Sequence, residues 1–99
     1  MKIGIFMVAF FGQPFEKALD QVKELDLEAV EIGAGGLAGK GHCNPKELLQ
    51  DKSKRDAFVK AVESRGLTIS ALAVHGNPLH PNKAIAEEHA QDLRDAVLL

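Results

Sequence analysis

Three apolar segments, each followed by signals for the start of a helix, constrain the fold of this chain more than any other feature. Residues 2–10 (KIGIFMVAF), 29–32 (AVEI) and 67–74 (LTISALAV) are rich in β-branched, aromatic and other apolar residues, which predicts strands. The first segment is apolar on both faces, as is typical of a strand that is covered on both sides in a parallel sheet. The order predicts an α/β fold with parallel βαβαβα topology.

The first predicted helix follows the "GQP" break, where Pro14 suits the first helical position. Its apolar residues recur at helical spacing, and they are Phe15, Ala18, Leu19, Val22 and Leu25. This spacing predicts one buried helix face.

The second helical region begins at "NPKE", a variant of the capping box with Asn44 as N-cap and Pro45 at the first helical position. It carries Leu48 and Leu49, is expected to restart near Ser53, and should end at a left-handed Gly66. Its apolar residues after the restart are Phe58, Ala61 and Val62. Asn82 is predicted to cap a third helix, whose apolar residues are Ile85, Leu93 and Val97.

Composition excludes some classes of function. The 99 residues suit one small domain or part of a larger one. A net charge of −2 and the absence of Trp and Tyr argue against a nucleic-acid partner. No segment is long enough to cross a membrane, and no cleavage site follows the apolar N-terminus as a signal peptide requires. Cys43 is the only cysteine, which fits a reducing cytoplasm, and nothing in the sequence marks it as an activated nucleophile.

The glycine-rich run "GAGGLAGKGH" after the second strand raises the question of phosphate binding. A P-loop needs glycine at position 34 and Ser or Thr at position 41, whereas the chain has Ala34 and Gly41. Gly33, Gly35 and Ala38 match the permissive dinucleotide pattern, but Pro45 marks a helix start several residues too late. The run is therefore predicted to be a flexible loop, not a nucleotide site.

Polar residues follow or approach the ends of the predicted strands. Because right-handed crossovers bring the loops that follow parallel strands to one edge, five of these residues are expected to line one face: Glu31, His42, His75, Asn77 and His80. Such a set can act as acid or base, hydrogen-bond a polyol, or approach a metal. The alternative is that these residues have structural roles, since His80 can stiffen the "NPLHP" turn and Glu31 can pair with a basic side chain inside the sheet. His89 is expected to be a surface residue.

The segments "MKIGIF", "LDLEAVEIGAGG", "GHCNPKELL" and "AFVKAVESRGLTISALAVHGNPLHP" together resemble the sugar phosphate isomerase/epimerase family. The resemblance covers nearly all of the chain, and "VEIG", "HCNP" and "HGNPLHP" are its most specific parts. It implies a xylose-isomerase-like (β/α)8 TIM barrel with its active site at the C-terminal rim. Residues 1–99 would form the first three βα units, one partial domain.

The resemblance also implies a divalent metal (Mn, Mg, Co or Zn), a sugar or sugar-phosphate substrate, and proton transfer next to a carbonyl. The family's metal ligands lie mostly on later strands, so no metal ligand is assigned within this chain. His75 is the residue expected to take part in the reaction as a polar contact to substrate. The expected substrate-binding residues are Glu31, His42, Asn77 and His80.

A complete barrel needs about 250 residues, so the chain alone is expected to lack isomerase activity. Three parallel strands leave open edges, which favours association of copies. The competing hypothesis is therefore a non-enzymatic α/β module that self-associates or binds a partner through an open sheet edge.

Overall fold

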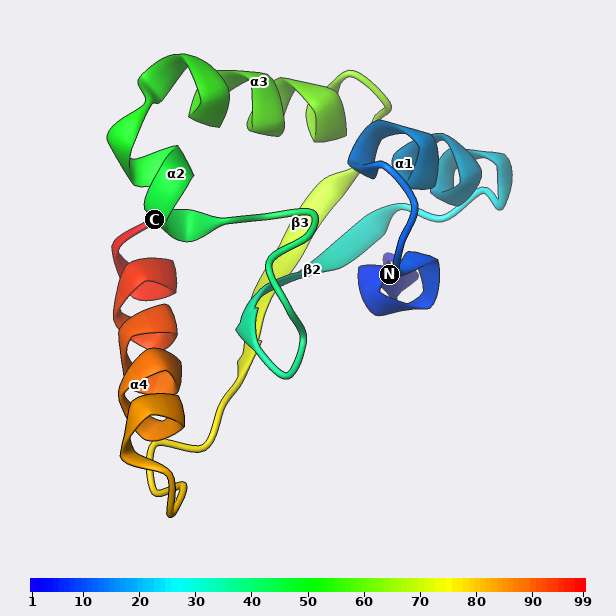
Figure 1. The fold of residues 1–99 in the computed structure, drawn as a ribbon. Helices are drawn as coiled ribbons and strands as arrows, with labels where there is room; N and C mark the ends of the chain where they lie inside the picture. The colour runs from blue at the N-terminus through cyan, green and yellow to red at the C-terminus, as the bar shows by residue number, and fades with distance from the viewer.

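A computed structural model describes all of residues 1–99 (Figure 1). Three strands alternate with helices along the chain. In order, the elements are β1 (Gly4–Phe6), the 3-10 helix η1 (Met7–Phe10), α1 (Phe15–Glu24), β2 (Ala29–Gly36), α2 (Pro45–Gln50), α3 (Lys52–Glu63), β3 (Thr68–His75) and α4 (Lys83–Leu98).

The three strands form one sheet in the order β1-β2-β3, and both pairings are parallel. The register aligns Phe6 with Glu31 and Glu31 with Ala71. The predicted α/β fold with a parallel sheet is confirmed. Because all three strands run in the same direction, each strand-to-helix loop leaves from the same, carboxyl-terminal edge of the sheet.

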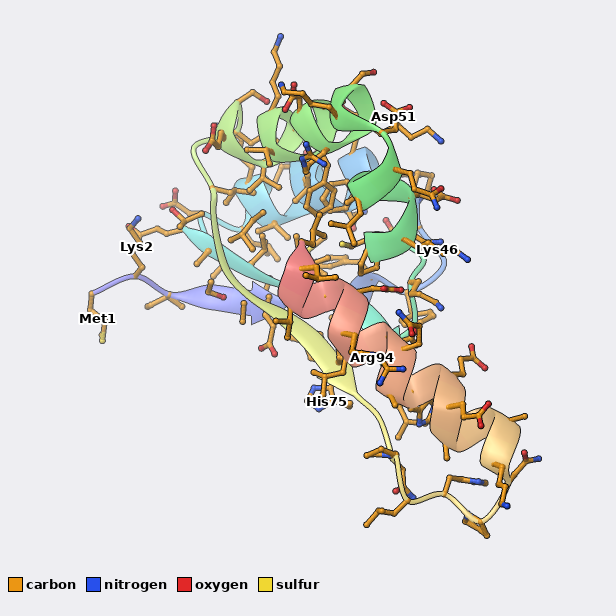
Figure 2. All side chains as sticks on the ribbon, turned by 90° about the vertical axis from the view of Figure 1, so that its left-hand side faces the viewer. Met1, Lys2, Lys46, Asp51, His75 and Arg94 are labelled. Carbon is orange, nitrogen blue, oxygen red and sulfur yellow. The ribbon has the colours of Figure 1, made fainter.

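The hydrophobic core lies on one face of this sheet. Alternate residues of β2 point into it, and Val30, Ile32 and Ala34 are buried there with residues of the helices, among them Leu19 and Val62. The alternation places Phe6, Glu31, Ala71 and His75 on the opposite face, which we call the open face. Figure 2 shows His75 on the side of the sheet away from α2 and α3. No helix is long and apolar enough to cross a membrane.

The first strand is much shorter than predicted. Only Gly4–Phe6 pair with β2, and Met7–Phe10 turn into η1 with Met7 buried in the core. A continuous apolar run does not distinguish a strand from a tight helical turn, because both bury such residues. The expectation of cover on both faces is also wrong, because Gly4 is exposed and Ile5 and Phe6 are only partly buried.

The second strand is longer than predicted, since β2 continues through the first three glycines of the run to Gly36. Register shifts at Val30/Glu31 and Gly33/Gly35 accommodate these glycines in the sheet. Glu31 therefore lies in the first half of β2 and not near its end, as the shorter strand had implied.

Several helix ends predicted from local sequence signals agree with the structure. The Asn82 side chain accepts from the Ala84 and Ile85 N–H groups, and Gly66 has φ +72°, so both predictions are confirmed. The restart near Ser53 is a new helix, α3, whose N-cap Asp51 accepts from two backbone N–H groups. Pro14 is the N-cap of α1 and not its first residue, and the Asn44 side chain makes no capping hydrogen bond.

The larger apolar residues of the last helix do not form its buried face. Leu93 and Val97 are 52% and 77% exposed, whereas Asp92 is buried and Ala96 packs against the core. Leu25, predicted on the buried face of α1, is likewise exposed after the helix end.

Candidate functional site

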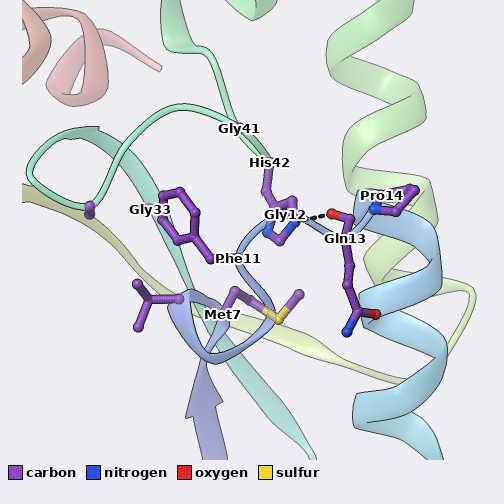
Figure 3. A pocket seen from close by; sticks show the side chains of 10 residues that line it. Met7, Phe11, Gly12, Gln13, Pro14, Gly33, Gly41 and His42 are labelled. Carbon is purple, nitrogen blue, oxygen red and sulfur yellow. Dashed lines mark hydrogen bonds between the residues drawn. The ribbon is translucent and has the colours of Figure 1, made fainter.

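A pocket of about 320 Å³ opens at the carboxyl-terminal edge of β1 and β2 (Figure 3). Apolar side chains and backbone from η1 and the segment after it form one wall, and Gly33 of β2 with residues that follow β2 forms the other. The residues that line this rim pocket are Met7, Val8, Phe11, Gly12, Gln13, Pro14, Gly33, Ala38, Gly41 and His42. Ligands of parallel α/β folds bind at this edge.

His42 is the only ionisable residue among them. Its Nε2 lies 2.7 Å from the carbonyl oxygen of Gln13, and its ring packs at 5.6 Å from the ring of Phe15. Because a carbonyl can only accept, Nε2 donates, and in the neutral ring Nδ1 is left as the basic nitrogen. An imidazole held in this way can accept a proton or hydrogen-bond a hydroxyl.

Gln13 carries a polar atom that sequence reasoning did not find. Its Oε1 is buried and has no hydrogen-bond partner, which normally costs free energy. Figure 3 shows the Gln13 side chain running from the hydrogen bond with His42 toward Met7. The position after a predicted strand was the only sequence signal that could have marked it.

The segment from Leu37 to Cys43, which we call the glycine loop, folds back over the strands. Ala38 lies directly on Gly33: a Cβ added to Gly33 would be 2.7 Å from the Ala38 carbonyl oxygen. The Leu37 N–H also donates to the His75 carbonyl at 2.8 Å. The loop therefore forms the second wall of the rim pocket and brings His42 to it.

A buried carboxylate on α4 holds this loop. Asp92 Oδ2 accepts from the Gly36 N–H at 2.9 Å, and Oδ1 lies 2.8 Å from Lys40 Nζ. Desolvation alone would raise the pKa of Asp92, but the Gly36 hydrogen bond, the Lys40 ammonium and nearby His89 together lower it below its ordinary value. The pKa of Lys40 is raised, chiefly by its hydrogen bond to Asp92. Sequence reasoning missed this ion pair.

The other predicted site residues lie outside the rim pocket. His75 ends β3, is exposed on the open face, and its ring meets that of Phe6 edge-on at 5.9 Å. Glu31 is partly buried on the same face. The structure thus places Glu31 and His75 on one side of the sheet, with His42 at its carboxyl edge.

Asn77 and His80 belong to the turn before α4, and their polar atoms are used locally. Asn77 Oδ1 accepts from the Leu79 N–H at 3.0 Å, and His80 Nδ1 accepts from the Asn82 N–H at 3.0 Å. The Asn77 N–H donates to His89 Nδ1 at 2.7 Å, so His89 is a partly buried partner of this turn, not the free surface residue expected.

Cys43, at the end of the glycine loop, is buried in the core with 1% of its surface exposed. Desolvation raises the pKa of its thiol to about 11. The prediction of an inert thiol agrees with this burial.

No three His, Cys, Asp or Glu side chains come together in the structure as a group that could hold a metal ion. Glu31, His42 and His75 are each of a ligating type, but they do not converge.

Comparison with curated proteins shows a relative of this chain. The chain is 36% identical over 98 residues to YfiH of Bacillus subtilis (strain 168), an uncharacterized protein. The match covers 99% of this chain and 31% of that protein, so the chain spans about a third of the relative's length. No family model and no solved structure matches the chain.

Proposed function

We propose that these residues form the first three βα units of a TIM-barrel isomerase or epimerase that acts on a sugar or sugar phosphate. The observation that carries the proposal is the rim pocket with His42, at the carboxyl-terminal edge of a parallel sheet. In TIM barrels the active site is built at this edge by the loops that follow the strands.

The arrangement of the sheet supports the barrel part of the proposal. Strands follow one another in sequence order, helices share one face with the core, and the open face carries the small residue Ala71 with Phe6, Glu31 and His75. In a closed barrel that face becomes the filled interior. The 98 matched residues are 31% of the relative, which is therefore about 316 residues long. This length exceeds the roughly 250 residues of a typical barrel.

The proposed reaction is proton transfer at a carbon next to the substrate carbonyl. His42 has the chemistry for one part of it, because a ring fixed through Nε2 can accept a hydrogen bond or a proton at Nδ1. The amide of Gln13, with an acceptor that has no partner, is suited to a sugar hydroxyl. Phe11 and Val8, both exposed, supply apolar surface against which the carbon skeleton of a sugar can lie.

His75 and Glu31 are proposed to face the substrate from the barrel interior, with Asn77 and His80 shaping the loop after β3. The divalent metal implied by the family resemblance (Mn, Mg, Co or Zn) does not fit the residues of this chain alone, because its possible ligands do not converge. Its ligands are proposed to lie on later strands, and no step is assigned to it here. The buried, unpaired thiol agrees with a cytoplasmic location.

The experiment uses the chain and a chimera in which it replaces the 98 matching residues of the relative. Ketoses and ketose phosphates are titrated into the chain by NMR, with the matching alditols, which lack a carbonyl, as controls. The chimera, with Mn²⁺ added, is then incubated with the same sugars in D₂O, and deuterium at the carbon beside the carbonyl is measured.

We expect sugar binding by both proteins and exchange only by the chimera. His42→Ala should weaken binding by about tenfold, the loss of one or two hydrogen bonds, whereas Lys52→Ala on the exposed side of α3 should not change it. A chimera that folds but neither binds a sugar nor exchanges a proton contradicts the proposal.

A second candidate function is self-association without catalysis. The observation in its favour is the unpaired outer edge of β3, beside an open face on which Ala71 and His75 are exposed. Light scattering distinguishes it: a compact oligomer of the 10.7 kDa chain that binds no sugar supports association, and a sugar-binding monomer supports the enzyme.

A further inference from the structure

Asp92 is the one charged residue among the buried side chains, and the mechanism proposed above does not use it. It lies on α4, while both of its partners, the Gly36 N–H and Lys40 Nζ, belong to or border the glycine loop. One carboxylate therefore joins the last helix to the wall of the rim pocket at two points.

The backbone opposite Asp92 has room for this contact only because it lacks side chains. A Cβ on Gly35 would lie 2.6 Å from Asp92 Cβ and 2.9 Å from Oδ2. Gly36, with φ +60°, then turns the chain from β2 into the loop so that its N–H meets the carboxylate. The glycines that resembled a phosphate-binding motif thus admit a carboxylate of the chain itself.

We propose that Asp92 is a positioning residue, which with Lys40 holds the glycine loop closed so that His42 stays in the wall of the rim pocket. We call the contacts of Asp92 with the Gly36 N–H and Lys40 the latch. The importance of the position of His42 rests on the proposed function, but the existence of the latch does not. Lys40 is 36% exposed and Asp92 is 8% exposed, so the Lys40 ammonium is the part that can be released to solvent when the loop opens. His42 lies two residues after Lys40 on the same loop, so an opening at Lys40 would displace His42 as well.

Cys43 makes loop opening measurable. It is the only cysteine of the chain, it ends the loop, and it is 1% exposed. A thiol reagent such as dithiobis-nitrobenzoate reacts with it only after the loop opens or the whole chain unfolds. These two routes differ in their response to urea, because the slope of a free energy against denaturant scales with the surface exposed. Local opening gives a rate that hardly depends on dilute urea, and global unfolding gives a steep dependence.

Four variants test the latch. Lys40→Met removes the cation, and Asp92→Asn removes the charge while keeping an oxygen that can accept from the Gly36 N–H. Lys40→Arg is the conservative rescue. Lys52→Met is the matched control, since it removes a lysine from the exposed Lys52–Asp56 pair on α3.

We expect Lys40→Met and Asp92→Asn to speed labelling of Cys43 by about tenfold at low urea. This corresponds to a loss of stabilisation between that typical of an exposed ion pair and that typical of a buried one. Lys40→Arg and Lys52→Met should stay within about twofold of the parent chain. Histidine NMR signals should show His42 shifting in the two fast variants only. Equal labelling in Lys40→Met and Lys52→Met overturns the proposal, as does acceleration that appears only with the steep urea dependence of global unfolding.

The assay contains no sugar, so it separates this inference from the proposed function. If the variants open the latch but the chain and the chimera bind no sugar, the proposed function is refuted and the positioning role of Asp92 stands. Sugar binding that is unchanged when the latch is broken refutes the role of Asp92 in the site and leaves the function standing.

Discussion

Gly33→Ala is the substitution whose effect follows most directly from the structure. The glycine lies in β2 beneath the glycine loop, and its φ is outside the left-handed region, so only space limits a side chain there. An added Cβ would be 2.7 Å from the Ala38 carbonyl oxygen and 3.2 Å from Ala38 Cβ. The nearest atom is backbone, so it cannot rotate away, and relief requires the loop to lift from the sheet.

The size of the effect is the difference between two opposing contributions. Overpacking of a tight contact costs about 1–3 kcal/mol. Replacing glycine by alanine recovers about 0.4–1 kcal/mol, because the unfolded chain loses conformational freedom. The net loss in the free energy of unfolding is therefore about 1–2 kcal/mol, which corresponds to a fall in Tm of about 5–15 °C for a domain of this size.

Gly41→Ala is the matched control, because it lies on the same loop with nothing within 4 Å of an added Cβ and no positive φ. Urea and thermal unfolding followed by circular dichroism should show Gly33→Ala destabilised and Gly41→Ala unchanged or slightly stabilised. Equal midpoints for the two variants would refute the close contact between Ala38 and the sheet. A loss of stability in Gly33→Ala without faster labelling of Cys43 would show that the strain is relieved somewhere other than the loop.

Three other predictions concern stability. Because the pKa of Asp92 is lowered in the folded chain, its stabilisation is complete above the unfolded pKa of about 4 and is lost as the pH falls through the folded pKa. The free-energy difference between the parent and Asp92→Asn, measured by urea unfolding, should thus shrink in acid; a constant difference would contradict the ion pair. Arg65→Met should cost about 1 kcal/mol, less in high salt, because Arg65 Nε donates to the exposed Asp20 at 2.7 Å. Calorimetry should show Leu19→Ala, in the core, destabilised by about 3 kcal/mol and Leu25→Ala, which is 60% exposed, by less than about 0.5 kcal/mol.

Features set by neighbouring residues were predictable from the sequence. Asn82 caps α4 and Gly66 ends the turn after α3 through contacts within a few residues, and such signals survive in any tertiary setting. The alternation of strands and helices, which requires only hydrophobic periodicity, gave the parallel α/β sheet. The identity of a larger barrel does not follow from these local signals.

Features set by tertiary contact were missed. Gly33 and Gly35 have low strand propensity, yet they lie in β2 because Ala38 and Asp92 pack against them where side chains would not fit. Residues 7–10 look like a continuing strand, but β2 offers β1 only the pairs from Gly4 to Phe6. The lengths of β1 and β2 therefore depend on contacts that composition does not encode.

For the candidate site, the sequence indicated His42, because a histidine after a strand in a parallel fold lies at the ligand-binding edge. It could not indicate Gln13 or Asp92, whose significance depends on burial. An unpartnered amide oxygen is unusual only once it is buried, and an aspartate in the middle of an amphipathic helix normally marks the solvent side.

The burial of Asp92 also explains the orientation of α4. Apolar periodicity alone would place Leu93 and Val97 inside and Asp92 outside, whereas the Gly36 N–H of β2 and the Lys40 ammonium of the glycine loop hold Asp92 inside. A carboxylate that meets a backbone N–H and an ammonium is stabilised enough to be buried, and Leu93 and Val97 then remain at the surface. Asp92→Leu should therefore lower stability although it buries an apolar residue, because the Gly36 N–H beneath it loses its acceptor and Lys40 loses its carboxylate partner. A variant with leucine at position 92 that is more stable than the parent chain would show that the apolar periodicity, and not the ion pair, sets the orientation of α4.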